Sequence, residues 1–263
     1  MTIDLDEIDW PRQLSGINEM APDLKRAIYC SLVPDAVFER FNASPDETDR
    51  LHINAPQDTG SVEVRLYNEP GDYDPVIYVH LVDTLNHQIE LLLLVINDPT
   101  SPRYNTDVTM DGLPTYFGTR GRNLAEELRA IDAGLAPGQV RRGLRLSGQA
   151  LPTLERFIKR LKHTMLIINP LTYNNAIVYE RYGFAYIQGK RRMEWIDSVL
   201  RPGGDYFERF DGTPFRPTKG WKSIRMRSWA IHDGILGEPF GEFRMYKRVG
   251  HHAGVDTFPD GVW

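Results

Sequence analysis

Cysteine and long apolar runs are almost absent from this sequence. Cys30 is the only cysteine among 263 residues, so no intramolecular disulfide and no multi-thiolate zinc site can form, which fits a reducing compartment. The longest apolar run, Leu91 to Ile96, is far too short to cross a bilayer. Residues 1–7 are acidic and lack the basic and apolar regions of a signal peptide. These absences predict a cytoplasmic protein with no membrane partner.

An excess of basic residues is lacking as well. The chain carries 31 Lys and Arg against 36 Asp and Glu, a formal net charge of -5. Nucleic-acid binding draws its affinity from clustered basic residues, so this balance argues against a nucleic-acid partner. No GxSxG, HExxH or GxxxxGK(S/T) pattern occurs, so the sequence lacks the motifs that serine hydrolases, zincins and P-loop proteins need for their chemistry. Adjacent His251 and His252 would point to opposite faces of a strand, so we expect no metal site.

The hydrophobic periods predict both helices and strands. Residues 1–20 show no period and are expected to form a loosely ordered arm. Apolar residues between Pro22 and Phe41 recur at helical spacing, and Pro34 divides this stretch into two helices. The run Leu91–Ile96 has no polar face, which predicts a central strand covered on both sides. Strands are predicted at 51–53, 62–67, 76–82, 88–97, 164–168, 184–195 and 242–249, and further helices at 123–133, 144–161 and 176–182.

One segment joins a predicted strand to a helix and then to another strand. It runs from Tyr173 to Phe184 and follows the strand that ends at Asn169. Asn174 or Asn175 can cap the helix through its side-chain oxygen, and Gly183 suits the left-handed position that ends a helix. This order of strand, Asn-containing loop, helix and Gly-Phe resembles the segment that closes the cofactor half of GNAT N-acetyltransferases.

A second segment lies upstream, at the head of the predicted helix 144–161. GNAT proteins bind the CoA pyrophosphate through a loop of pattern Gln/Arg-x-x-Gly-x-Gly/Ala leading into a helix, where backbone N–H groups cradle the phosphates. Arg145-Leu146-Ser147-Gly148-Gln149-Ala150 is similar to this pattern. Arg141-Arg142-Gly143-Leu144-Arg145 also resembles the Arg-Gly-x-Gly centre of the same loop, with Arg145 in place of a small residue. Both registers stay open, and in either the three arginines form a basic cluster suited to a phosphate-rich ligand.

The resemblance implies a fold class and a domain organisation. The fold class is α/β (α+β), with a GNAT-like mixed central sheet and flanking helices, in a single domain over residues 1–263. Its parts are an N-terminal helical arm (1–57), a core (about 58–199) with an insertion (98–138), a second insertion (197–240), and a closing strand and tail (241–263). The insertion 98–138 is a departure, because in the family the phosphate loop follows its strand almost directly.

The resemblance also implies ligands and site residues. The co-substrate is acetyl-CoA or another acyl-CoA, the acceptor is an amine of a small molecule or peptide, and no metal takes part. Tyr179 resembles the residue that protonates the leaving thiolate, with a packed aromatic side chain as the alternative. A backbone N–H holds the thioester carbonyl in the cleft beside the central strand, and the end of the strand Leu91–Asn97, with Val95, binds the pantetheine arm. The implied cofactor-binding residues are Arg142, Gly143, Arg145, Gly148, Ala150, Val95, Asn174 and Asn175.

No motif assigns the general base or the acceptor site. Glu90, Asp98 and the pair His232-Asp233 are candidate bases. Both insertions flank positions where GNAT acceptor pockets are built, so we expect them to cover the acceptor; the aromatic residues of the second insertion equally suit core packing or a homodimer interface. Two other hypotheses stay open. One is a degenerate GNAT module that binds CoA or another ligand without turnover, or serves as an interaction scaffold, and the other is an unrelated α/β enzyme.

Overall fold

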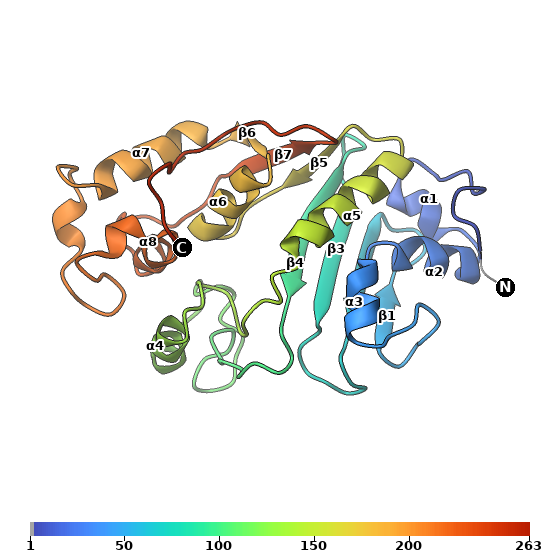
Figure 1. The fold of residues 1–263 in the computed structure, drawn as a ribbon, viewed down its shortest axis with the longest axis horizontal. Helices are drawn as coiled ribbons and strands as arrows, with labels where there is room; N and C mark the ends of the chain where they lie inside the picture. The colour runs from blue at the N-terminus through green and yellow to red at the C-terminus, as the bar shows by residue number, and fades with distance from the viewer. Residues whose placement is uncertain (1–2) are drawn as a thin grey trace. The chain divides into compact units, whose positions relative to one another are not determined.

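The structure is a computed structural model that describes residues 3–263, and these divide into two compact units (Figure 1). The first unit comprises residues 3–100, 143–168 and 246–252, and the second comprises residues 101–142, 169–245 and 253–263. The strands follow one another in the order β1-β2-β3-β4-β5-β7-β6. The chain is therefore α+β with a mixed sheet and flanking helices, which confirms the predicted fold class.

Five strands belong to the first unit. β1 through β4 pair antiparallel in sequence order, and β4 pairs parallel with β5. Alternate side chains of β2 and β3 are buried, as Val62, Val64 and Leu66 illustrate, because only one face of these strands is covered. The five bounds are β1 (Leu51–Asn54), β2 (Ser61–Leu66), β3 (Ile77–Asp83), β4 (Ile89–Ile96) and β5 (Met165–Ile168).

The helices of the first unit gather on one side of these strands (Figure 1). Pro34 stands immediately before α3, so the predicted division of the stretch 22–41 at this proline is confirmed. Phe157 of α5 packs against Trp10 and Tyr29, and its ring centroid lies 5.4 Å from that of Trp10 and 6.3 Å from that of Tyr29. The four helices are α1 (Leu14–Asn18), α2 (Pro22–Cys30), α3 (Asp35–Arg40) and α5 (Ser147–Arg160).

The N-terminal arm is ordered, contrary to the prediction of a loose arm over residues 1–20, of which residues 1 and 2 lie outside the described part. Trp10, Leu14 and Ile17 are buried. The N–H groups of Leu14 and Ser15 each donate to the carboxylate of Asp83 at 2.9 Å. A carboxylate at the first turn satisfies donors that the helix itself leaves unpaired. This partner lies at the end of β3, too distant in sequence for a local pattern to reveal.

Strand β4 is not covered on both sides, which corrects the prediction for the run 91–96. Leu91 is fully buried, but Leu92 is 40% exposed and Leu93–Ile96 are half-buried. β5 pairs with Ile89–Leu91, and within residues 3–263 no strand pairs with the second half of β4 on that edge. The apolar run therefore belongs to a partly exposed strand, and burial in the sheet does not account for its aliphatic side chains.

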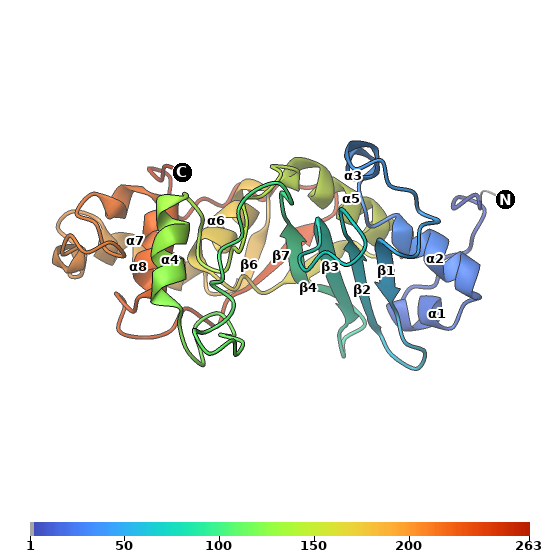
Figure 2. The same ribbon diagram turned by 90° about the horizontal axis from the view of Figure 1, so that it is seen from below.

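The second unit is mainly helical. Its elements are α4 (Leu124–Asp132), α6 (Tyr173–Arg181), β6 (Ala185–Gln188), α7 (Lys190–Leu200), η1 (Phe207–Arg209), η2 (Gly220–Lys222) and α8 (Ile224–His232). β7 (Arg244–Arg248) begins in this unit and ends in the first. Trp229 of α8 is fully buried against Ala130 and Leu135, so α8 lies beside α4 (Figure 2). Sequence periodicity does not predict α8, because six of its nine residues are buried, none is exposed, and the buried ones include Arg227 and Ser228.

Two predictions for residues 173–195 have different outcomes. Gly183 ends α6 with φ of 82°, and the N–H groups of Gly183 and Phe184 donate to the carbonyls of Glu180 and Tyr179, the paired bonds of a Schellman end. The predicted strand 184–195 is wrong beyond Gln188. Gly189 takes φ of 103°, a conformation that favours glycine, and the chain turns there into α7.

Within residues 3–263, no helix combines the length and the apolar character needed to span a membrane.

Candidate functional site

The parallel neighbours β4 and β5 pair over three residues only. Ile89–Leu91 stand opposite Leu166–Ile168, and β5 ends there. β4 continues to Ile96 with β3 as its partner on one side. In the described part of the chain, the other edge of Leu92–Ile96 has no strand partner.

Backbone groups of Leu94 and Ile96 face this free edge. The Asn97 N–H donates to the Val76 carbonyl on the β3 side at 2.8 Å. Hydrogen-bonded and non-hydrogen-bonded pairs alternate along an antiparallel ladder, so Val95 also bonds to β3 whereas Leu94 and Ile96 turn their N–H and C=O groups away. The backbone of Val95 is thus used inside the sheet, which corrects its implied role in binding the pantetheine arm: the backbone groups that face the free edge are those of Leu94 and Ile96.

A β-bulge marks the point where the free edge begins. His80 of β3 pairs with Leu93, but the next β3 residue, Leu81, pairs with Leu91. Leu92 is therefore an extra residue in β4, and bulges of this kind re-aim side chains and are frequent beside functional sites. The sequence 91–96 carries no signal for the bulge, because leucine occupies every position around it.

The loop before α5 comes close to the end of β4. A Cβ added at Gly143 would stand 3.2 Å from the Ile96 carbonyl oxygen, so a glycine allows this approach. In the described chain the N–H groups of Ser147 and Gly148, the first two residues of α5, donate no hydrogen bond. Free N–H groups at a helix N-terminus attract anions. Ala150 does not fit its predicted role, because it is buried and its N–H donates to the Leu146 carbonyl at 2.9 Å.

Arg145 takes a backbone conformation that glycine normally provides. Its φ is 60°, in the left-handed region that L side chains avoid at a cost of roughly 1–2 kcal/mol. This agrees with the register Arg142-Gly143-Leu144-Arg145, in which Arg145 replaces a small residue of the loop pattern. The Arg145 side chain is exposed, as are Gly143 and Gly148, so the loop is open to a ligand.

Four of the implied site residues belong to the second unit. The guanidinium of Arg142 donates to the Ala133 carbonyl at 3.2 Å. The α6 helix starts at Tyr173 with no side-chain cap, so neither Asn174 nor Asn175 caps it, contrary to prediction. Asn174 is buried, accepts a hydrogen bond from the Ser228 hydroxyl at 2.7 Å, and donates to Asn175 at 3.0 Å. Its carboxamide therefore joins α6 to α8.

Tyr179, the implied acid, is half-buried on α6. Its ring packs against Phe184 with centroids 5.1 Å apart. Burial raises the pKa of the Tyr179 phenol above its ordinary value, because the phenolate loses hydration. The hydroxyl therefore stays protonated around neutral pH. A proton donor requires this, and a tyrosine that only packs in the core would show the same protonation.

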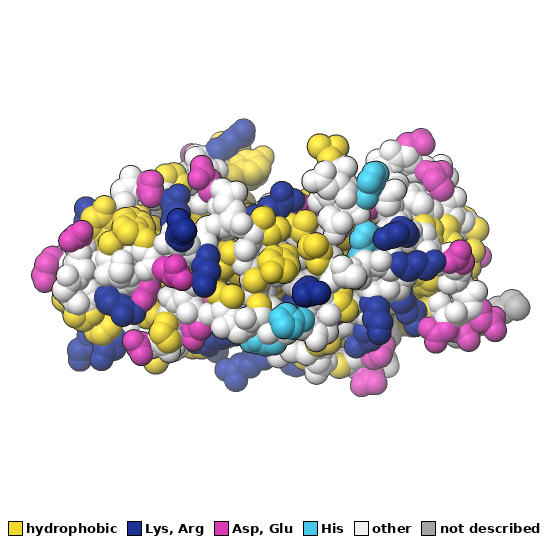
Figure 3. Space-filling view, turned by 90° about the horizontal axis from the view of Figure 1, so that it is seen from above, with side chains coloured by type: hydrophobic (Ala, Val, Ile, Leu, Met, Phe, Trp, Pro, Cys, Tyr) yellow, Lys and Arg dark blue, Asp and Glu magenta, His cyan; other side chains and the backbone are white. Residues whose placement is uncertain are grey.

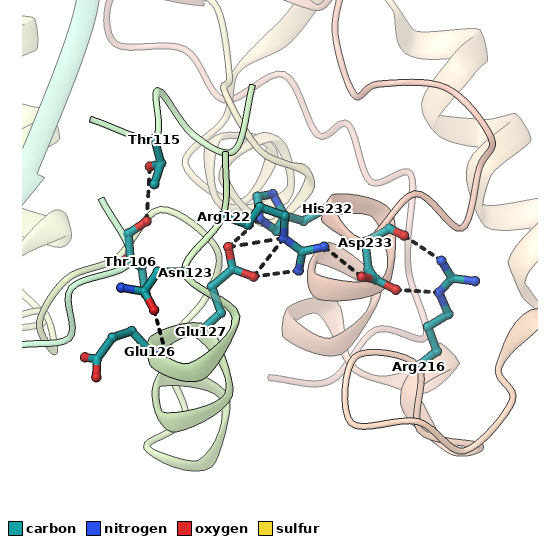
Figure 4. Close-up of polar contacts among 9 residues, drawn as sticks. All are labelled: Thr106, Thr115, Arg122, Asn123, Glu126, Glu127, Arg216, His232 and Asp233. Atoms are coloured by element: carbon teal, nitrogen blue, oxygen red, sulfur yellow. Dashed lines mark hydrogen bonds and ion pairs between the residues drawn. The ribbon is translucent and has the colours of Figure 1, made fainter. Parts of the chain in front are cut away.

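A network of charged side chains links the two inserted segments of the second unit (Figure 4). The Arg122 guanidinium bridges the Glu127 carboxylate of α4, at 2.5 Å, and the Asp233 carboxylate after α8, at 2.8 Å. Arg216 binds the other Asp233 oxygen at 2.9 Å. His232 Nε2 lies 3.1 Å from Glu127 Oε1. Sequence patterns predict only His232 and Asp233, because the contacts that join the two segments, Arg122 with Asp233 and His232 with Glu127, span 111 and 105 residues.

Glu127 is the electrostatic centre of this network. Its side chain is 3% exposed, and burial by itself raises the pKa of the carboxyl. The hydrogen bonds and charges of His232 and Arg122 outweigh that effect and hold the pKa of Glu127 below its ordinary value. The carboxylate is thus ionised and fixes one ring nitrogen of His232, an arrangement that orients an imidazole for proton transfer. His232 itself is 16% exposed.

The two insertions also share an apolar core. Trp229, Ala130 and Leu135 are buried together, and Tyr104 and Phe215 pack against them. The Trp229 indole N–H donates to the Leu135 carbonyl at 2.8 Å. Core packing, one of the two alternatives for the aromatic residues of the second insertion, therefore accounts for Trp229 and Phe215. Whether the insertions cover the acceptor stays a prediction.

The remaining candidate bases lie in the first unit. Glu90 is buried and stands in register between Val82 of β3 and Ile167 of β5, one residue before the strands part. Asp98 accepts hydrogen bonds from the N–H and hydroxyl of Thr100, at 3.0 and 2.7 Å, which is a local turn. Position thus favours Glu90 over Asp98.

A separate cavity lies away from the predicted site residues. A cavity of about 1170 Å³ in the first unit is lined by the N-terminal arm, α2, α3 and α5, including Cys30 and Arg160, and none of the predicted site residues lines it. Residues 3–263 contain no group of three or more His, Cys, Asp or Glu that could hold a metal ion. Basic and acidic side chains are interspersed over the face shown in Figure 3.

Comparisons with family models, with curated proteins and with solved structures give no match to this chain.

Proposed function

We propose that this chain is an acyl-CoA-dependent N-acyltransferase of the GNAT type, which transfers an acetyl or longer acyl group to an amine of a small molecule or peptide. One observation carries the proposal. β4 leaves its parallel neighbour after Leu91–Ile168 and then runs with a free edge to Ile96, where it meets Gly143 and the loop before α5. In GNAT proteins the thioester lies where the central strand separates from its neighbour, and the diphosphate lies at the following helix.

The donor half of this site is supported by residues of the first unit. The free N–H groups of Ser147 and Gly148 suit the diphosphate, with the Arg145 guanidinium as an additional charge. The backbone groups of Leu94 and Ile96 suit the amides of the pantetheine arm, which can bond to a strand edge as another strand does. We therefore propose that the thioester lies in the region of Leu92, where the edge begins.

The chemistry requires few groups. The amine nitrogen attacks the thioester carbonyl carbon, the carbon–sulfur bond breaks, the amine loses a proton to a base, and the thiolate of CoA takes a proton. Glu90 is the base that position favours, and the resemblance assigns the thiolate proton to Tyr179, whose phenol stays protonated. A backbone N–H at the free edge stabilises the oxyanion of the tetrahedral intermediate.

Calorimetric titration with CoA and acetyl-CoA, followed by thiol release with a panel of primary amines, tests the proposal. We expect binding and amine-dependent release of CoA thiol. Gly148→Asp, which adds a negative charge to the exposed helix N-terminus, should abolish CoA binding, whereas Gly241→Asp, at an open surface position, should leave it unchanged. Absence of CoA binding by the wild-type chain contradicts the assignment.

A module that binds CoA without turnover is the second candidate. It is favoured by the occupation of most candidate bases: Asp98 closes a local turn, and His232 and Asp233 are held in the network with Arg122. Binding of CoA without thiol release from any amine would select it.

A further inference from the structure

We infer that the acyl pocket of this protein is apolar and takes a medium-length aliphatic acyl chain in preference to acetyl; the inference rests on the proposed function. Its starting point is the aliphatic half of β4. Leu92–Ile96 are all aliphatic, and all five are at least partly exposed, although a strand in the middle of a sheet ordinarily buries such side chains. A ligand that covers them removes apolar surface from water.

The proposed diphosphate site determines the position of the acyl group along β4. Gly143 and the N-terminus of α5 stand at the Ile96 end, so the diphosphate occupies that end. From Ile96 back to Leu92 the strand covers about 13 Å, a length that an extended pantetheine arm spans. The thioester then reaches Leu92, the bulged residue, just where the pairing with β5 begins.

Around the bulge, the two faces of the sheet differ in burial. Leu81 of β3 and its register partner Leu91 of β4 are fully buried on the face that the helices of the first unit cover. Leu93 pairs with His80, on the opposite face, whose residues are half-buried. An acyl chain longer than acetyl therefore leaves along the face that carries Leu93.

The bulge supplies the apolar floor on that side. Leu92 has the most exposed side chain of β4, at 40%, and the extra residue brings it next to Leu93 instead of alternating with it. Together the two leucines present adjoining aliphatic surface at the thioester position. An acetyl group ends there, whereas a chain of six to eight carbons would lie across both.

The experiment is a calorimetric series with CoA, acetyl-CoA, butyryl-CoA, hexanoyl-CoA and octanoyl-CoA, and it needs no knowledge of the acceptor. Each methylene that is covered should tighten the dissociation constant about fourfold, the factor that corresponds to about 0.8 kcal/mol per buried methylene. Free CoA with added octanoate serves as the control for unspecific apolar binding and should behave as CoA alone.

Leu92→Asn should flatten the dependence of the dissociation constant on acyl-chain length. Leu85→Asn removes a leucine that is fully exposed in the turn before β4, and this matched control should keep the wild-type series. Thermal unfolding of both variants checks the fold.

Three outcomes are distinct. If CoA itself does not bind, the proposed function fails and the inference fails with it. If CoA binds and all acyl-CoAs bind equally, or Leu92→Asn keeps the wild-type series, the transferase proposal stands and the inference is overturned. If light scattering shows that Leu92→Asn dissociates an oligomer, Leu92 belongs to an interface between copies of the chain, which also overturns it.

Discussion

The indole N–H of Trp229 donates to the carbonyl oxygen of Leu135 at 2.8 Å, across 94 residues of sequence. Both residues are buried, and they join the inserted segment around α4 to the one that carries α8. The two insertions are thus parts of one folded subdomain. Neither is a loop attached separately to the sheet.

Trp229→Phe should lower the free energy of unfolding by about 3 kcal/mol. The change leaves the buried Leu135 carbonyl without its donor and opens a cavity where the larger ring was. Urea unfolding measures the effect. Trp195→Phe, at a position that is 37% exposed, should cost under about 1 kcal/mol; equal losses for both would show that Trp229 does not link the segments.

Glu127→Gln should destabilise the chain by about 1–3 kcal/mol at pH 7, because buried charge-assisted hydrogen bonds from Arg122 and His232 are lost. The pKa of Glu127 is lowered in the folded chain, so its contribution is present above the ordinary carboxyl pKa of about 4.3 and is lost as the pH falls through the lower folded value. The difference in unfolding free energy between wild type and variant should therefore shrink as the pH falls below about 4.

The matched control for that experiment is Glu194→Gln on α7, whose carboxylate forms an exposed pair with Lys190 at 3.5 Å. We expect a change of at most about 0.5 kcal/mol, because exposed pairs contribute little. A pH-independent loss in Glu127→Gln would mean that the carboxylate charge does not stabilise the network.

Gly143→Ala should weaken CoA binding about fivefold, which corresponds to about 1 kcal/mol. The new methyl group would stand 3.2 Å from the Ile96 carbonyl oxygen and push the loop a few tenths of an ångström from β4. Calorimetry measures the affinity, and Gly241→Ala, which meets no atom within 4 Å, is the control. If Gly143→Ala leaves the affinity for CoA unchanged, the close contact between Gly143 and β4 is not needed for CoA binding.

Tyr179→Phe should lower the turnover number by a factor on the order of 10² with little change in CoA affinity, because the phenol would supply a proton only to the departing thiolate. Thiol-release kinetics and calorimetry measure the two quantities separately. Tyr182→Phe, the neighbouring tyrosine just after α6, is the control. A variant that turns over at the wild-type rate would leave Tyr179 as a packed aromatic only.

Much of the first-unit fold could be predicted from the sequence because its signals are local. The alternation from Val62 to Leu66 predicts a strand, and Pro34 predicts a break between two helices, each from a few neighbouring residues. The strand predicted over 184–195 failed at Gly189, where one positive φ redirects the chain. α8 could not be predicted, since burial of its polar residues Arg227 and Ser228 removes the amphipathic pattern on which helix prediction depends.

The candidate site divides in the same way. The glycine and arginine pattern over 141–150 is contiguous, so the sequence points to the loop and helix where free N–H groups are found. The free backbone edge at Leu94 and Ile96 depends on where β5 stops, and the network around Arg122 depends on contacts between distant segments. Neither feature can be predicted from local residue spacing. For that reason the sequence led to Val95 as a cofactor-binding residue instead of its neighbours Leu94 and Ile96.

The extra residue in β4 reverses the parity of the strand. Odd-numbered Ile89 and Leu91 lie on the helical face, as do even-numbered Leu94 and Ile96, because the count slips by one at Leu92. Removing any single residue between 91 and 93 would restore one alternation from end to end and exchange the faces of everything beyond it. Shortening by one residue should therefore harm this strand more than most point substitutions.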